Sequence, residues 1–97
     1  MVRHCVLFRF TETTTAEDVE RIGTAAGELP ARIPSIKAYA FGPDLRLGAG
    51  SWDFAIVGDF EDADGWAAYD SHPDHARFRA DVIGPHIAER AAVRFTL

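Results

Sequence analysis

The stretch YDSHPDH gathers side chains that could transfer protons, because it places Tyr69, His72 and His75 within seven residues. A further histidine, His4, lies near the start of the chain. Imidazole has an unperturbed pKa near 6.5, so a neutral histidine can remove a proton from a carbon next to a carbonyl group. A phenol beside it can donate a hydrogen bond to the developing enolate oxygen. These residue types therefore predict general base chemistry on a keto compound.

Other interpretations of the same residues remain open. His75 and Tyr69 could hydrogen-bond each other or a backbone carbonyl group and stabilise a break between two helices. His72 stands directly before Pro73, where it is expected to cap a helix. A metal site that pairs His72 with His75, with Asp74 nearby, has no clear third ligand, and helical metal pairs are usually four residues apart. We therefore expect neither a metal nor another cofactor.

Composition restricts the classes of protein to which this chain can belong. Its 97 residues are expected to form one domain, residues 1–97, and the net charge is −5. No basic patch indicates nucleic-acid binding, and no apolar run reaches the roughly 20 residues of a membrane span. The first ten residues do not resemble a signal peptide. A single cysteine, Cys5, is typical of a reducing compartment, so we expect a cytoplasmic protein.

The elements that must position these side chains follow from periodicity. Alternation predicts strands at residues 4–10, 36–41, 51–60 and 91–97, and helical spacing predicts helices at residues 14–33, 61–70 and 73–83. The first helix is expected to begin with a capping box, either Thr14 with Glu17 or Thr15 with Asp18, and to be closed by Pro30 and Pro34. The order βαββαβ predicts an α+β fold, with a four-stranded antiparallel sheet covered by helices on one face.

Each face of the predicted sheet carries apolar residues. The strongest apolar stripes are expected to face the helices, and they contain Val6, Phe8, Phe10, Trp52, Phe54, Ile56, Phe60, Val93 and Phe95. The opposite face is expected to hold Cys5, Leu7, Tyr39, Phe41, Ala55, Val57 and Ala92, with Arg9, Asp59 and Arg94 among them. Because no helix remains to cover this second face, we expect a homodimer whose interface includes Leu7, Phe41 and Val57.

The first strand and the helix after Pro73 should converge on one cleft between the sheet and the helices. We expect that cleft to bind a small hydrophobic ligand or keto substrate. Its predicted polar residues are His4, Tyr69 and His75, and its predicted apolar wall is Val6, Phe8, Ile56 and Phe78.

Four segments of the chain resemble one known family. RHCVLFRF, LPARIPSIKAYAFG, SWDFAIVGDF and YDSHPDH are similar to the stress-responsive dimeric α+β barrel (Dabb) family, and the likeness runs from Val2 to about Phe95. Its most specific part is the first-strand histidine combined with Tyr-x-x-His-Pro-x-His. The resemblance implies a ferredoxin-like protomer and a homodimer in which two sheets close into a barrel.

One branch of that family consists of polyketide cyclases resembling olivetolic acid cyclase, which act without a cofactor. The resemblance implies a catalytic pair formed by Tyr69 and His75, with His4 beside it. Beyond Phe78 the segment GPHIAER departs from the cyclase pattern, which leaves the substrate open. Two alternatives remain: a non-catalytic, stress-associated dimer that binds an apolar ligand, and a cofactor-independent monooxygenase, an activity found on the related barrel architecture.

Overall fold

The first strand, β1 (Val2–Phe10), lies inside the sheet of the computed structural model, which describes residues 1–97. Its side chains alternate as the sequence predicts, with His4 and Phe8 buried and Leu7 exposed. The alternation arises because successive side chains of a strand point to opposite faces of the sheet.

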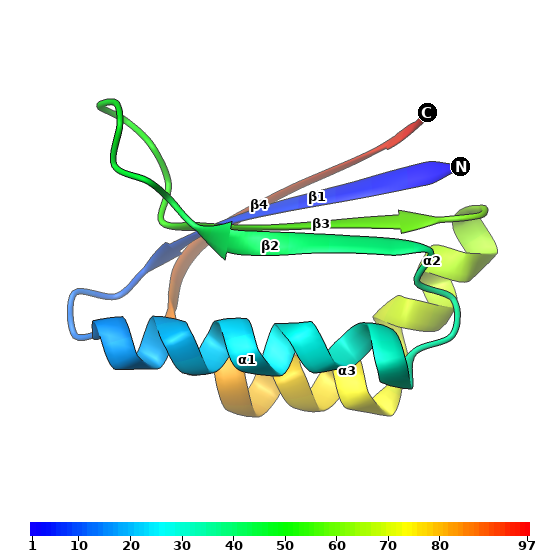
Figure 1. Cartoon of the computed structure of the whole chain (residues 1–97), viewed down its shortest axis with the longest axis horizontal. Helices are drawn as coiled ribbons and strands as arrows, with labels where there is room; N and C mark the ends of the chain where they lie inside the picture. The colour runs from blue at the N-terminus through cyan, green and yellow to red at the C-terminus, as the bar shows by residue number, and fades with distance from the viewer.

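The sheet has four strands in the order β2-β3-β1-β4, and each strand is antiparallel to its neighbours. The other strands are β2 (Ala38–Pro43), β3 (Phe54–Phe60) and β4 (Ile87–Thr96). The helices are α1 (Ala16–Arg32), α2 (Ala63–Asp70) and α3 (Pro73–Arg77). All of them lie on one side of the sheet (Figure 1). The ferredoxin-like α+β fold expected from the sequence is confirmed.

The start of α1 follows the second of the two expected capping pairs. Thr15 accepts a hydrogen bond from the Asp18 amide, and the Asp18 side chain accepts one from the Thr15 amide. The helix ends at Arg32, ahead of Pro34 as expected, whereas Pro30 does not end it and lies within its last turn. Proline removes one hydrogen bond there, but Leu29 and Ile33 are both buried, and the Ile33 amide still donates to the Leu29 carbonyl.

The break between α2 and α3 has the capping geometry expected from its sequence. His72 is the N-cap of α3 and accepts a hydrogen bond from the Asp74 amide on Nδ1, at 3.1 Å. Pro73 follows at the first helical position, where a missing N–H costs nothing. The helical path then continues through a π-helical turn (Phe78–Ile83) and a 3₁₀ turn (Gly84–His86) into β4.

The predicted faces of β2 are reversed in the structure. Tyr39 pairs with Gly58 and Phe41 pairs with Ile56, so both aromatic residues share the helix-covered face. They were expected on the opposite face. Because β2 carries small or apolar residues at both sets of alternating positions, its own sequence could not decide its orientation, and pairing with β3 decided it.

The faces of β4 are reversed as well. Val93 pairs with Cys5 and Phe95 pairs with Arg3, which places both apolar residues on the open face. Arg94 pairs with His4 and therefore lies on the helix-covered face, where the sequence did not place it. Alternation establishes the period of a strand, but the register with its neighbour decides which set of residues is covered.

Trp52 also lies on the open side, although it was expected beside Phe54. It precedes β3, so the alternation of that strand does not extend to it, and the Arg9 guanidinium stacks on its ring at 4.5 Å from the centroid. Asp59 lies on the open face, as expected, and its partner there is Arg3. Asp59 accepts two hydrogen bonds from Arg3, at 2.7 and 2.9 Å.

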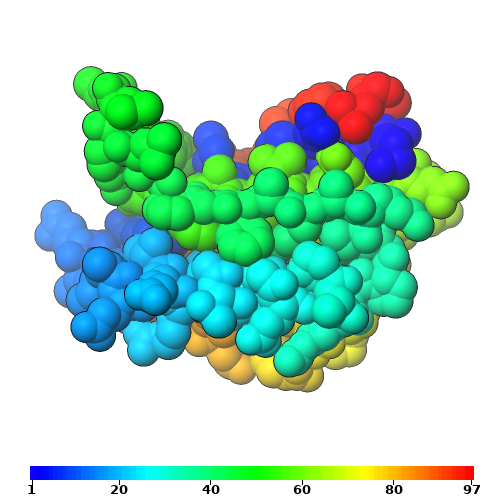
Figure 2. Space-filling view, in the orientation of Figure 1, coloured from blue at the N-terminus to red at the C-terminus, as the bar shows by residue number.

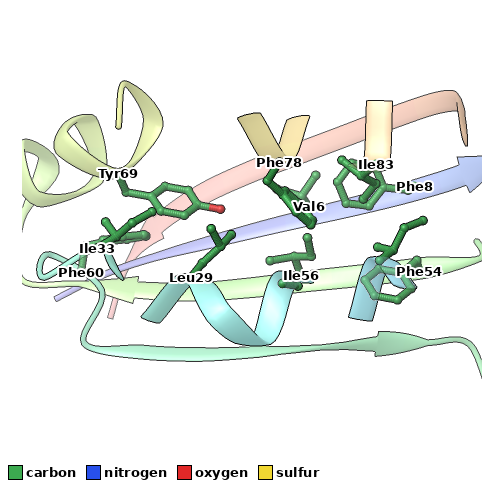
Figure 3. Close-up of a cluster of buried hydrophobic side chains, with 12 residues drawn as sticks. Val6, Phe8, Leu29, Ile33, Phe54, Ile56, Phe60, Tyr69, Phe78 and Ile83 are labelled. Atoms are coloured by element: carbon green, nitrogen blue, oxygen red, sulfur yellow. The ribbon is translucent and has the colours of Figure 1, made fainter. Parts of the chain in front are cut away.

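The core lies between the sheet and the helices (Figure 3). Its twelve buried hydrophobic residues are Val6, Phe8, Ile22, Ala26, Leu29, Ile33, Phe54, Ile56, Phe60, Tyr69, Phe78 and Ile83. The open face of the sheet has no such cover, and its outline is concave between the β2–β3 loop and the chain ends (Figure 2). Leu7, Val93 and Phe95 are 41%, 59% and 46% exposed on that face.

Candidate functional site

A cavity of about 230 Å³ lies between the sheet and the helical segments that follow α1. Seven of its lining residues are those expected from the sequence: His4, Val6, Phe8, Ile56, Tyr69, His75 and Phe78. The remaining lining residues are Arg79, Ile83, Ile87 and Arg90. The structure therefore brings the three predicted polar side chains and the predicted apolar wall together around one space. Figure 3 shows the Tyr69 hydroxyl directed toward Val6 and Phe78.

His75 reaches the cavity from the first turn of α3, and it is 7% exposed. Its Nδ1 lies 3.1 Å from the backbone carbonyl oxygen of Asp70. Because a carbonyl oxygen can only accept, Nδ1 carries the hydrogen and the neutral ring keeps a lone pair on Nε2. Burial lowers the pKa of His75 below its ordinary value, which favours this neutral form. The side chain is therefore available as a base.

His4 has the opposite tautomer, because its partner is a donor. Its Nδ1 lies 3.2 Å from a guanidinium nitrogen of Arg94, and guanidinium groups cannot accept. The hydrogen of the neutral ring is therefore on Nε2, which makes that atom a hydrogen-bond donor. Burial, with a smaller effect from Arg94, lowers the pKa of His4 to about 4, so the ring is neutral at pH 7.

Tyr69 is almost fully buried and contacts both His75 and Tyr39. Its ring packs against that of His75, with centroids 4.1 Å apart, and its hydroxyl oxygen lies 2.8 Å from the hydroxyl oxygen of Tyr39. Burial raises the pKa values of both phenols, which therefore stay protonated at neutral pH. Tyr39 was missed as a site residue because the sequence assigned β2 the wrong face.

Three arginines were also missed. Arg79 and Arg90 line the cavity, and Arg94 lies beside it on His4 and over the ring of Trp66 at 4.4 Å. Alternation in β4 places residues 90 and 94 on one face, but only the pairing with β1 shows that this face looks toward the helices.

The other two histidines lie away from the cavity. His72 caps α3, as expected, and the Nδ1 atom of His86 lies 3.1 Å from the Thr14 hydroxyl oxygen. No group of three His, Cys, Asp or Glu side chains is arranged to hold a metal ion.

A second, larger groove of about 970 Å³ runs between α1 and the ends of β1, β2 and β3. Its lining contains no histidine, cysteine or tyrosine. Two of its carboxylates, Asp44 and Asp53, are already paired with Arg46. The smaller cavity is therefore the better candidate for proton-transfer chemistry.

The sequence matches the stress-responsive A/B barrel domain over residues 2–97. The chain belongs to this family. Among solved structures, a dimeric ferredoxin-like protein of unknown function from Thermobifida fusca YX is 50% identical in sequence to this Dabb chain. The two structures align with a TM-score of 0.92, over 99% of this chain and 90% of the other. Among curated proteins, no sequence matches.

More distant structures share the fold of this Dabb protein. A dimeric protein of unknown function from Bacteroides fragilis is 25% identical, with a TM-score of 0.86 over 99% of this chain and 95% of the other. A hydroxynitrile lyase from Passiflora edulis is 19% identical, with a TM-score of 0.85 over 99% of this chain and 92% of the other. None of the helices of this Dabb protein is long and apolar enough to cross a membrane.

Proposed function

We propose that this protein is a cofactor-free enzyme that cyclises or isomerises a hydrophobic keto compound, with His75 as general base. The observation that carries the proposal is the pair of opposite histidine tautomers at one apolar cavity. His75 keeps a lone pair on Nε2, whereas His4 carries a hydrogen on Nε2. Removing a proton next to a carbonyl group requires both a base and a hydrogen-bond donor.

The chemical step uses these groups in turn. Nε2 of His75 takes a proton from the carbon next to the carbonyl group, and the C–H electron pair forms the enolate. His4 and Tyr69 donate hydrogen bonds to the enolate oxygen, while Tyr39 donates to Tyr69. In an aldol cyclisation the enolate carbon attacks a second carbonyl carbon, and the resulting alkoxide takes the proton back from His75. In an isomerisation the proton returns to another carbon of the same system.

The size of the cavity limits the substrate. A cavity of about 150 Å³ holds benzene, so 230 Å³ suits a single ring or a short chain of about nine non-hydrogen atoms. Val6, Phe8 and Ile56 supply an apolar wall without hydrogen-bonding groups. Such a wall favours the neutral imidazole of His75 and excludes water from the enolate.

A non-catalytic role in ligand binding is the second candidate. It is favoured by the hydrogen bond between His75 and the Asp70 carbonyl, which also stabilises the break between α2 and α3. Both candidates use the same cavity, so they differ in turnover and not in the position of the ligand.

The test compares His75→Ala with His72→Ala. Deuterium exchange at the α-carbon of phenylacetone, followed by NMR in D₂O, measures proton removal without requiring the natural substrate. We expect His75→Ala to lose roughly 10²–10⁴-fold in exchange rate. His72→Ala should keep the rate and lose about 1 kcal/mol of stability with its helix cap.

Thermal melts of both variants control for folding. Equal exchange by His75→Ala and the wild-type protein would contradict the assignment of the base. No exchange by the wild-type protein above the buffer rate would favour the ligand-binding role.

We also propose that the working form is a homodimer in which the open sheet faces of two copies pack together. The exposed apolar residues Leu7, Val93 and Phe95 support this proposal. So does the relative from Thermobifida fusca, which is described as dimeric and is 50% identical.

A further inference from the structure

Positive charge is concentrated at the cavity, although the whole chain has a net charge of −5. Arg79 enters the lining from the π-helical turn and Arg90 enters it from β4. Arg94 lies directly behind His4. The cavity lining contains no Asp or Glu, and the neighbouring Asp70 carboxylate is paired with Arg79. Three guanidinium groups therefore surround a small apolar space with a single carboxylate beside them.

Two of these arginines already have partners. Arg94 donates to His4, and Arg79 lies 3.4 Å from the Asp70 carboxylate. Arg90 takes part in none of the ion pairs or side-chain hydrogen bonds of the molecule. Its five N–H donors are therefore free to bind an anion from outside the chain.

The position of Arg90 directs that free charge toward the ligand space. Arg90 pairs with Phe8 across the sheet, so its side chain projects on the same face as Phe8, which is part of the apolar wall. Arg90 lines the same cavity as His4, Tyr69 and His75, so its charge faces the space that those three groups share. The side chain itself is exposed, so it lies at the mouth of the cavity.

We propose that the ligand of this cavity is a small amphipathic monocarboxylate, a keto acid in the catalytic case, whose carboxylate binds Arg90 with help from Arg79. The keto part of the inference rests on the proposed function, but carboxylate binding does not. The apolar part of the molecule lies against Val6 and Phe8. A guanidinium group matches the two oxygens of a carboxylate in a bidentate geometry. Because Arg79 is shared with Asp70, the mouth offers one uncompensated positive charge, which suits a monoanion better than a phosphate dianion.

The experiment measures binding of two unreactive probes, 3-phenylpropanoate and its neutral amide, by calorimetry at about pH 7.5, where carboxylates are ionised. The two probes have the same ring and chain length, so the ratio of their affinities isolates the charge. We expect the wild-type protein to bind the carboxylate about 10- to 100-fold more tightly than the amide, as charge-assisted hydrogen bonds allow.

Arg90→Gln should reduce this preference to less than about threefold, and Arg79→Gln should reduce it by a smaller factor. Arg32→Gln is the matched control, because it removes the same charge from an exposed position at the end of α1 and should leave the preference unchanged. Chemical-shift changes at His4 and His75 on adding the carboxylate should place the probe in the cavity.

Equal affinity of the wild-type protein for both probes would overturn the proposal, as would a preference that survives in Arg90→Gln. Shift changes confined to the open sheet face would overturn it too. His75→Ala separates this test from that of the proposed function, since it should lose α-proton exchange and keep the carboxylate preference.

Discussion

At the scale of single residues, the partners of each histidine determine what it can do. Both imidazoles line the same cavity, but they have different hydrogen-bond partners. His75 bonds to a backbone carbonyl, which accepts, and His4 bonds to the Arg94 guanidinium, which donates. Their neutral forms consequently present opposite groups on Nε2, a lone pair on His75 and an N–H on His4. The motif YDSHPDH cannot predict this difference in tautomer, because Arg94 comes from the far end of the chain.

His4 should make the stability of the protein depend on pH. Its pKa is about 4 in the folded state and about 6.5 when unfolded, so the unfolded state binds more protons as pH falls between these values. We expect the free energy of unfolding to be largest above pH 6.5 and to fall by about 1–2 kcal/mol by pH 5 through His4 alone. Urea denaturation at several pH values and constant protein concentration measures it.

His4→Gln should flatten this dependence without abolishing it, because the pKa of His75 is shifted in the same direction. The carboxylates with lowered pKa values, among them Asp59, lose their contribution only at lower pH. An unchanged slope between pH 6.5 and 5 in His4→Gln would contradict the shift.

At the scale of elements, the helical path after α3 depends on close approach of the backbone. The π-helical turn ends at Gly84, whose amide donates to the Arg79 carbonyl. A β-carbon added to Gly84 would collide with that carbonyl oxygen. This turn carries Phe78 and Ile83 into the core and Arg79 to the cavity, so the glycine indirectly positions part of the site.

Two glycine substitutions should therefore have opposite effects. Gly84→Ala forces backbone atoms apart and should cost about 1–3 kcal/mol. Gly23→Ala, inside α1 with no atom in the way, should stabilise the protein by about 0.5–1 kcal/mol through helix propensity. Thermal melts compare the two variants with the wild-type protein, and equal melting temperatures would contradict the tight turn.

At the scale of the whole molecule, the sheet has one covered and one open face. The helices bury the core on one side (Figure 1), while exposed apolar residues from β1 and β4 remain on the other. A domain of this size buries only about 60–65% of the surface of its unfolded chain, so a second copy on the open face would add the burial that a small chain lacks. The corrected faces change which residues a second copy would cover. Val93 and Phe95 join the open side, whereas Phe41, which was expected in the interface, lies on the helix-covered face.

Val57→Glu should disrupt the proposed dimer, because it places an unpaired charge in the middle of that face. Light scattering after gel filtration should give twice the 10.7 kDa chain mass for the wild-type protein and about the chain mass for the variant. Ala31→Glu is the matched control, since it adds the same charge at an exposed position of α1 and should leave the dimer intact. A monomeric wild-type protein at micromolar concentration would contradict the proposal.

The sequence by itself determined the order of the elements, the fold and most of the cavity lining. Those features depend on local periodicity, as in β1, and on capping residues, as at Thr15 and His72, which act over a few neighbouring positions. The seven lining residues could be predicted from the sequence because they lie on elements whose buried faces are unambiguous.

Only the tertiary structure decided the orientation of β2 and β4. Both strands alternate between two sets of acceptable residues, so a pattern read along one strand cannot show which set faces the helices. Pairing with β3 and β1 placed Tyr39 and Arg94 on the helix-covered face, where Tyr39 contacts Tyr69 and Arg94 contacts His4. The hydrogen-bond partners that define the site, and the free guanidinium of Arg90, exist because segments distant in the chain meet there.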